Sequence, residues 1–235
     1  MFSPAVVFLD FDGTITCRDV TDAVLERFAH AEWQDVEREW VAGRIGSREC
    51  LARQMALVRA EPRALDSLLD SIEVDPGFVP LLDACAARRV PVHIVSDGFD
   101  YCIRRVLGRP ELKGRIERVN IVSSGLEWTG RAWRTFFANP AELCAHGCGT
   151  CKSLAIERLR GGAPVVLFAG DGLSDRHAAH AVSRVGVAYA KSALAAFCDE
   201  RAIDYLPYDT LADVAVGVER VMHAAAHGAA VLKGV

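Results

Sequence analysis

The stretch that decides the fold is residues 6–16, VVFLDFDGTIT. Its first four residues are apolar, which predicts a short buried strand, and the strand runs directly into Asp10 and Asp12. Because side chains alternate between the two faces of a strand, these two carboxylates point the same way. Two like charges at that separation repel unless a positive group lies between them. The sequence therefore has to supply or recruit a cation at this point.

The composition is that of an ordinary globular protein. The 235 residues are 51% hydrophobic and 25% charged, which suits one large domain or a core with a small inserted cap. The net charge is −4 and there is no basic tract, which argues against a nucleic-acid partner. No apolar run approaches the length that spans a membrane, and the N-terminus has no basic start typical of a signal peptide. We therefore expect a cytoplasmic enzyme.

The chain has eight cysteines, and in a chain of this length we expect mostly reduced thiols. Three of them, Cys144, Cys148 and Cys151, form a C-x₃-C-x₂-C pattern with His146 among them. A structural zinc site, a redox pair and simple packing of thiols under the active-site loop are the three interpretations. Packing is favoured, because no second distant pair of metal ligands accompanies the three.

The segment after the first strand is helical. Apolar residues recur at spacings of three and four over residues 20–43, Ser47 resembles the N-cap of a helix that runs to residue 59, and Pro62 opens a further helix. The segment has no strand signal. We therefore expect residues 16–70 to form a helical cap, inserted into a core made of residues 1–15 and 71–235.

After residue 76 the pattern alternates between helix and strand. The expected helices cover residues 77–88, 99–107, 174–182 and 192–198, and the expected strands cover 90–95, 165–169 and 185–188. Residues 115–136 predict a β-hairpin with Ser-Ser-Gly and Thr-Gly turns. Its Trp128 and Trp133 are expected to pack against the protein, with a homodimer interface as the alternative. The alternation implies an α/β, Rossmann-like parallel sheet with ligands at the carboxyl ends of its strands. The residues expected to converge there are Asp10, Asp12, Ser96, Asp171 and Asp175.

Hard carboxylate oxygens in a small cluster suit Mg²⁺. Asp10 and Asp171 are the expected metal ligands. Asp10 is also a candidate nucleophile toward phosphorus, and Asp12 a candidate general acid and base. Lys152 is the natural cation for a phosphoryl group, and Ser96 with the amides near Asp97 and Gly98 can bind phosphate oxygens.

Four motifs in order, DFDGTIT, VSDG, CKSLAIERL and AGDGLSD, resemble those of the haloacid dehalogenase superfamily of phosphohydrolases. The resemblance covers essentially the whole chain and implies Asp10 as nucleophile, Asp12 as acid and base, and Asp171 as metal ligand. It further implies a metal contact from the Asp12 backbone carbonyl, phosphate contacts from Thr14 and Ser96, charge stabilisation by Lys152 and support from Asp175. The helical insertion is similar to the cap of the branch that contains phosphoserine phosphatase.

Within that branch, HGCGTCKSL resembles the approach to the lysine in the methionine-salvage group, which cleaves 2-hydroxy-3-keto-5-methylthiopentenyl-1-phosphate. Asp19 stands where phosphoserine phosphatases carry a glutamate, and their cap arginine falls at Gln54. Arg53 resembles the cap arginine of the methionine-salvage group, whereas Asp97 departs from that group's Ser-Gly-Gly. Asp19, Arg53, Asp97 and Gly98 are therefore candidate substrate contacts.

The resemblance implies a Mg²⁺-dependent phosphatase of a small-molecule phosphate ester. The methionine-salvage ester is the first candidate substrate, and phosphoserine, phosphoethanolamine, phosphocholine or a specialised biosynthetic ester are the alternatives. Asp12 argues against a dehalogenase of the same fold, which lacks that second aspartate. The intact set Asp10, Asp12, Lys152 and Asp171 argues against a silent phosphometabolite-binding protein. A phosphotransferase is left open.

Overall fold

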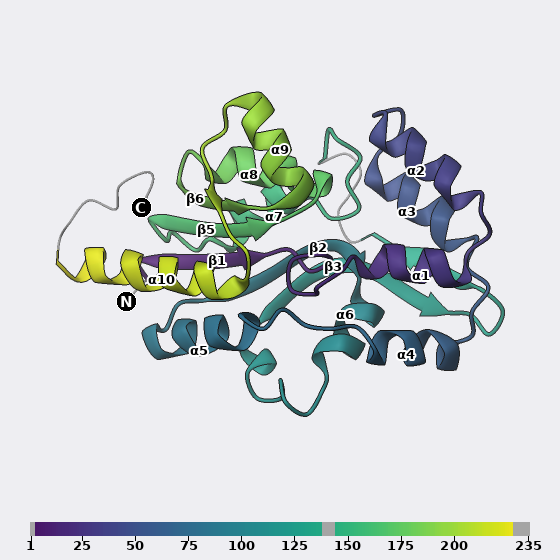
Figure 1. Ribbon diagram of the computed structural model, residues 1–235, viewed down its shortest axis with the longest axis horizontal. Coiled ribbons are helices and arrows are strands. Elements are labelled where there is room, and N and C mark those ends of the chain that lie inside the picture. The colour runs from purple at the N-terminus through teal and green to yellow at the C-terminus, as the bar shows by residue number, and fades with distance from the viewer. Residues whose placement is uncertain (1–2, 138–143, 228–235) are drawn as a thin grey trace.

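A computed structural model describes residues 3–137 and 144–227. Its centre is a sheet of seven strands in the order β4-β3-β2-β1-β5-β6-β7 (Figure 1). Neighbouring strands are parallel except for β3 and β4, which are antiparallel. The expected α/β, Rossmann-like fold is confirmed. The strands are β1 (Ala5–Leu9), β2 (Val92–Phe99), β3 (Asn120–Trp128), β4 (Trp133–Phe136), β5 (Val165–Gly170), β6 (Gly186–Ala190) and β7 (Leu206–Pro207).

Helices cover both faces of the sheet, which explains why β1 is apolar throughout (Figure 1). Val6 and Phe8 belong to a cluster with α7, α8 and α9, whereas Val7 and Leu9 belong to the cluster on the other face with α5, α6 and α10. The strand is thus buried from both sides, and its carboxyl end opens at one edge of the core. These helices are α5 (Phe78–Arg88), α6 (Asp100–Leu107), α7 (Lys152–Leu159), α8 (Arg176–Val182), α9 (Ser192–Arg201) and α10 (Leu211–Ala226).

Four helices lie between β1 and β2 in the chain: α1 (Val20–Phe28), α2 (Trp33–Val41), α3 (Ser47–Met55) and α4 (Pro62–Asp70). Thr16 pairs with Val74 in an antiparallel bridge, so the chain enters and leaves this insertion along adjacent connections. Helices α2 and α3 pack together, α3 contacts β4, and α4 contacts α6. We accordingly propose residues 16–70 as a cap on a core formed by residues 1–15 and 71–235. None of the described helices is both long and apolar enough to cross a membrane.

Several element boundaries differ from those expected. The helical pattern over residues 20–43 is broken into α1 and α2, and α3 ends at Met55 rather than at residue 59. Strand β2 does not end at Ser96 but continues to Phe99, with a register shift against β3 between Val95 and Phe99. Ser96, Asp97 and Gly98, which are candidate site residues, therefore lie within the irregular part of this strand. Two further elements, the 3₁₀ turns η1 (Ile116–Arg118) and η3 (Leu173–Asp175), precede β3 and α8.

The hairpin exists, but it has one turn rather than two. The Ser-Ser-Gly segment lies inside β3, and the chain reverses only between Trp128 and Trp133. Trp133 is buried, and its indole N–H donates to the carbonyl oxygen of Ala60 at 2.8 Å. Its ring also lies edge-on to Tyr101, with the centroids 5.0 Å apart. Trp133 therefore fastens the cap to the core and offers no free surface to a second copy of the chain.

Candidate active site

Asp10 lies at the carboxyl end of β1 and is buried. Its backbone N–H donates to the carbonyl of Ala169 in β5 at 2.9 Å, which fixes the residue between the two central strands. Lys152, the first residue of α7, places Nζ 2.8 Å from Asp10 Oδ1 and 2.5 Å from Asp175 Oδ1. It also donates to Ser174 Oγ at 3.0 Å. The structure thus brings together Asp10, Lys152 and Asp175, which lie far apart in the sequence.

Carboxylate oxygens of Asp10, Asp171 and Asp175 lie within 4.8 Å of one another. Burial raises the pKa of Asp10 well above its ordinary value, and the Asp175 charge raises it further. Burial likewise raises the pKa of Asp171 to about 6, again with a contribution from Asp175. Lys152 alone does not neutralise this cluster. A group of hard oxygens with excess negative charge fits Mg²⁺, which is bound by carboxylates and relieves their repulsion.

Asp171 is held by residues behind the sheet edge. Thr14 Oγ1 donates to Asp171 Oδ1 at 2.8 Å and lies 3.3 Å from the hydroxyl of Tyr208. Thr14 is fully buried and does not line the cavity described below, so it orients the metal-ligand candidate rather than touching phosphate. Gly13 has a φ of +70°, and a Cβ there would lie 2.3 Å from Asp171 Oδ2. Gly13 thus leaves room for the Asp171 carboxylate, and Thr14 holds it by a hydrogen bond.

Asp175 is positioned by the backbone that follows β5. Its Oδ2 accepts hydrogen bonds from the N–H groups of Asp171 and Gly172, both at 3.1 Å. Its Oδ1 faces Lys152. Asp175 is completely buried, and these contacts hold the metal-ligand loop and the lysine in one arrangement. These contacts are compatible with the supporting role predicted for it.

Asp12 sits where the core meets the cap. Its Oδ1 accepts the N–H of Val20 at 3.0 Å, at the start of α1, and Ser96 Oγ donates to its Oδ2 at 3.4 Å. Burial raises the pKa of Asp12 to about 6, although the Val20 N–H opposes the shift. A carboxyl with that pKa can both donate and accept a proton near neutral pH. A Cβ on Gly98 would lie 2.2 Å from Asp12 Oδ2, so the glycine makes room for this carboxyl.

Asp97 lies in the cavity wall, and its carboxylate is held by protein donors. The hydroxyl of Ser47 donates to one of its carboxylate oxygens and the N–H of Thr150 to the other, the latter at 2.7 Å. Ser47 is therefore not the N-cap of α3, a position that Gly46 occupies. Asp97 lines the cavity, but both its oxygens are engaged by protein donors from α3 and from the loop before Lys152. It joins cap, core and loop.

A cavity of about 270 Å³ opens above these residues, between α2 and α3 on one side and the strand ends on the other. Asp10, Asp12, Ser96, Gly98 and Asp171 form its floor. None of the described residues that line it is a lysine or arginine. Its walls include acidic side chains (Asp19, Asp22, Glu37), apolar ones (Trp40, Val41, Leu51, Leu173) and uncharged polar ones (Thr21, Ser47, Gln54, Ser174).

Of the two cap-side candidates, one reaches the cavity and the other does not. Asp19 lines it and also caps α1, accepting the N–H of Asp22 at 2.8 Å. Arg53 instead points its guanidinium at Glu39, at 2.9 and 3.0 Å, and at Glu49, at 3.3 Å. The expectation that Arg53 contacts substrate is therefore wrong for this arrangement. Successive residues of a helix project about 100° apart, so the next residue turns inward in its place.

That next residue is Gln54, which is buried, lines the cavity and donates to Glu37 Oε2 at 2.8 Å. Tyr208, Ser174 and Ser47 are further site residues that sequence reasoning missed. Ser174 lies inside the AGDGLSD motif but was not singled out, and Tyr208 and Ser47 belong to no motif with recognisable spacing. Their positions depend on how α3, η3 and the segment after β7 pack on the core.

Arg53→Ala is expected to change kcat/KM for phosphate release by less than about threefold, because its guanidinium pairs with exposed or half-buried carboxylates outside the cavity. Gln54→Ala, one residue along the same helix, should raise KM about tenfold, because it removes a buried hydrogen bond in the cavity wall. Steady-state kinetics on both variants compares the two positions. A large KM increase in Arg53→Ala alone would restore the arginine as the substrate contact.

Comparisons with known proteins find relatives that match this chain over most of its length. A protein of Geobacillus kaustophilus named 2-hydroxy-3-keto-5-methylthiopentenyl-1-phosphate phosphatase is 28% identical over 224 residues, which cover 94% of this chain and 98% of the relative. A Bacillus cereus protein of the same name is 25% identical over 219 residues, or 92% and 96% of the two chains.

The similarity extends to solved structures. A phosphoserine phosphatase with a phospho-aspartyl intermediate analogue has a TM-score of 0.66 at 15% identity, over 90% of this chain and 97% of that one, which supports the shared fold. The sequence pattern of the haloacid dehalogenase-like hydrolases matches residues 7–180, from β1 through the Asp171 and Asp175 loop. On this match, which spans most of the chain, the protein belongs to the haloacid dehalogenase-like hydrolase family.

Proposed function

We propose that this hydrolase is a Mg²⁺-dependent phosphatase that cleaves a small-molecule phosphate monoester through a phosphorylated Asp10. A phosphatase activity agrees with the family and with the names of the relatives. The observation that carries the proposal is the position of Lys152, which pairs with Asp10, a residue of the cavity floor, and with the buried Asp175. A buried lysine beside a nucleophilic carboxylate is an arrangement suited to stabilising the charge of a phosphoryl group.

In the first step Asp10 attacks phosphorus, and the bond from phosphorus to the leaving alcohol oxygen breaks. Asp12 gives its proton to that oxygen as it leaves. Ser96 is placed for this step, because it contacts Asp12 and its Oγ also accepts the N–H of Gly98 at 3.0 Å. Burial disfavours the charged form of Lys152, but the Asp10 and Asp175 carboxylates raise its pKa above the ordinary value, so it stays a cation.

In the second step Asp12 accepts a proton from water, and that water attacks the phosphorus of phosphorylated Asp10. The acyl phosphate bond breaks, inorganic phosphate leaves and the Asp10 carboxylate is restored. The same carboxyl acts first as acid and then as base, which suits its pKa of about 6.

We assign the metal to Asp10 and Asp171, with the Asp12 backbone carbonyl as a further ligand. When bound, Mg²⁺ would neutralise charge on the carboxylates and on the transferred phosphoryl group. Thr14 and Tyr208 support Asp171 from behind, and the N–H groups of Asp171 and Gly172 keep Asp175 turned toward Lys152.

The residues that line the cavity indicate which class of substrate it can bind. Without a lysine or arginine among the described lining residues, the cavity offers no partner for a second anionic group such as the carboxylate of phosphoserine. Trp40, Val41 and Leu51 provide an apolar wall that suits an uncharged tail. We therefore propose as substrate a phosphate ester whose remaining part is uncharged and partly apolar, of which the ester named for the Geobacillus kaustophilus relative is the first candidate.

A second candidate follows from the acidic side of the same wall. Asp22 and Glu37 line the cavity together with Trp40, and carboxylates beside an aromatic ring attract an ammonium group. This supports phosphoethanolamine or phosphocholine as the alternative substrate class.

The test is phosphate release from a panel of phosphorylated metabolites, measured with Mg²⁺ and with EDTA. The panel holds the methylthiopentenyl ester, phosphoethanolamine, phosphocholine and phosphoserine. We expect release that falls at least about 100-fold in EDTA and returns when Mg²⁺ is added, because the clustered carboxylates then lack their counter-charge. The lowest kcat/KM is expected for phosphoserine.

Each result of the panel has a separate meaning. No release from any ester by folded protein would refute the phosphatase proposal, and release that survives EDTA would refute the metal assignment. New phosphoesters formed in the presence of added alcohols would identify a phosphotransferase instead.

A further inference from the structure

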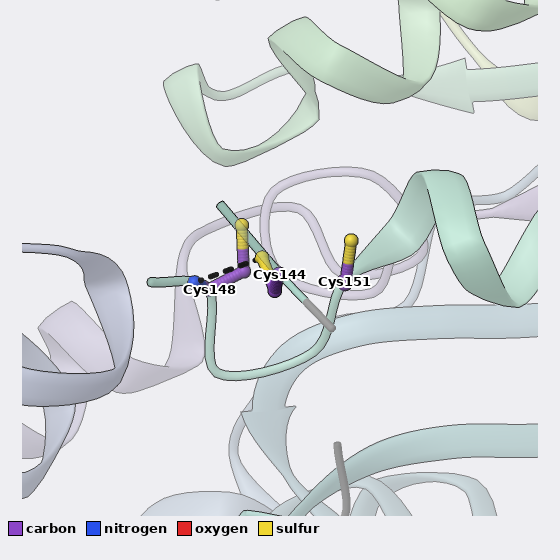
Figure 2. A group of neighbouring side chains, drawn as sticks. All are labelled: Cys144, Cys148 and Cys151. Carbon is purple, nitrogen blue, oxygen red and sulfur yellow. Dashed lines mark hydrogen bonds between the residues drawn. The ribbon is translucent and has the colours of Figure 1, made fainter. Parts of the chain in front are cut away.

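Three cysteines come together on the loop that leads into Lys152 (Figure 2). The sulfur atoms of Cys144, Cys148 and Cys151 all lie within 4.8 Å of one another. All eight cysteines of the chain are free thiols, so these three do not form a disulfide. Cys144 and Cys151 are buried and Cys148 is half-buried. The N–H of Cys148 points at the Cys144 sulfur at 3.5 Å. None of the catalytic steps derived above uses these thiols.

The size of the group fits a single ion. A tetrahedral zinc with bonds of about 2.3 Å to sulfur spaces its thiolates about 3.8 Å apart, within the limit observed here. A [4Fe–4S] cluster attaches each cysteine to a different iron and spreads the sulfurs further. A disulfide would use two of the sulfurs and leave the third without a role. We propose that Cys144, Cys148 and Cys151 bind one zinc ion, at a site separate from the carboxylate cluster.

The surroundings of the sulfurs support a ligand role. Metal-bound thiolates are commonly stabilised by hydrogen bonds from their neighbours, and the Cys148 N–H is directed at the Cys144 sulfur in this way. Among the described residues no histidine, aspartate or glutamate joins the three sulfurs, which leaves the fourth position of the tetrahedron open to water or another ligand. His146, which lies on the same loop, stacks on His177 of α8 with the ring centroids 3.6 Å apart and holds the loop from outside the cluster.

The site has a mechanical consequence, because the loop touches both the cap and the catalytic lysine. Gly149 donates its N–H to Ser47 Oγ at 3.0 Å, and Arg48 donates its N–H to the Gly147 carbonyl at 3.0 Å. At its other end Cys151 is the N-cap residue of α7, whose first residue is Lys152. An ion that binds all three sulfurs therefore fixes the loop between α3 and Lys152.

The test is the zinc content of the full chain, purified under reducing conditions, incubated with ZnCl₂ and freed of excess metal. Millimolar Mg²⁺ is kept throughout, so that the carboxylates are not left open to zinc. Mass spectrometry of the metals should find about one zinc per chain in the wild type and less than about one-tenth in Cys148→Ser. Cys198→Ser, which alters a buried cysteine outside the cluster, and Asp171→Asn, which alters the carboxylate cluster, should both retain about one zinc.

Two further readouts do not depend on activity. Cobalt in place of zinc should give a thiolate-to-metal charge-transfer band in the wild type and in Cys198→Ser, and a much weaker band in Cys148→Ser. Zinc should raise the melting temperature of the wild type by about 5 °C or more and leave that of Cys148→Ser unchanged. Circular dichroism establishes that Cys148→Ser is folded.

Three results would overturn the proposal. The first is a wild-type chain that keeps less than about one-tenth of an equivalent of zinc. The second is Cys148→Ser retaining as much zinc as the wild type, and the third is iron with acid-labile sulfide in place of zinc. A disulfide among the three cysteines in zinc-free protein prepared without reductant, together with the first result, would identify a redox pair. None of these results depends on the phosphatase proposal.

Discussion

Asp10→Asn is expected to lower kcat for phosphate release by at least about 10⁴-fold, because an amide cannot form the acyl phosphate. The substitution keeps the shape of a side chain that is fixed by its own backbone bond to β5 and by Lys152. Burial and the Asp175 charge raise the pKa of Asp10 well above its ordinary value, so a neutral amide costs less to bury there, and Lys152 keeps Asp175 as a charged partner. The free energy of unfolding is therefore not expected to fall. Stopped phosphate assays and denaturant unfolding measure the two quantities.

Asp12→Asn is the matched variant, because it removes a carboxyl two residues along without touching the nucleophile. Its loss of kcat should be smaller, about 10² to 10⁴-fold. The substitution should slow both the transfer of the phosphoryl group to Asp10 and the release of phosphate from it. Intact-protein mass spectrometry after acid quenching should then show more phosphorylated chain than in the wild type, and none in Asp10→Asn. Residual activity of Asp10→Asn within tenfold of the wild type would exclude Asp10 as the nucleophile.

The parts of the site that the sequence predicted are those fixed by the ends of strands. A short apolar run is buried on both faces only in a layered α/β core, and the residues that follow it must then emerge at the carboxyl edge. That reasoning placed Asp10 and Asp171 together, and they lie in one carboxylate group with Asp175. The order of helices and strands up to α9 also followed from pattern, although β2 extends through Ser96 because its pairing with β3 is irregular. Neither β7 nor α10 was predicted.

The parts that the sequence did not predict depend on the orientation of elements after packing. Whether Arg53 or Gln54 faces the cavity is decided by a rotation of about 100° of α3 about its axis, and that rotation is set by contacts with α2 and β4. Tyr208 reaches Thr14 from a part of the chain 194 residues away, which no local pattern encodes. Asp97 departed from the family pattern, and its partners Ser47 and Thr150 come from the cap and from the cysteine loop.

Lys152→Met is expected to reduce both stability and activity. Lys152 is buried and faces two buried carboxylates, at 2.8 and 2.5 Å, so its loss leaves those charges without a partner. Breaking a buried pair in this way costs about 3–5 kcal/mol in the free energy of unfolding. The value of kcat should fall by about 10² to 10³-fold, since the cation that faces the phosphoryl group is gone. Urea unfolding and steady-state kinetics, each with saturating Mg²⁺, measure the two losses.

The double variant Lys152→Met/Asp175→Asn separates the structural role from the catalytic one. Removing the Asp175 charge together with the lysine should recover about half of the lost stability, because one fewer carboxylate is left unpaired, yet kcat should remain as low as in the single variant. Lys113→Met, at an exposed lysine away from the cavity, should leave both quantities unchanged within error. If the double variant regains activity along with stability, Lys152 acts only by holding Asp175 in place. If Lys152→Met is as stable as the wild type, the two carboxylates are protonated in the folded protein and the lysine does not neutralise them.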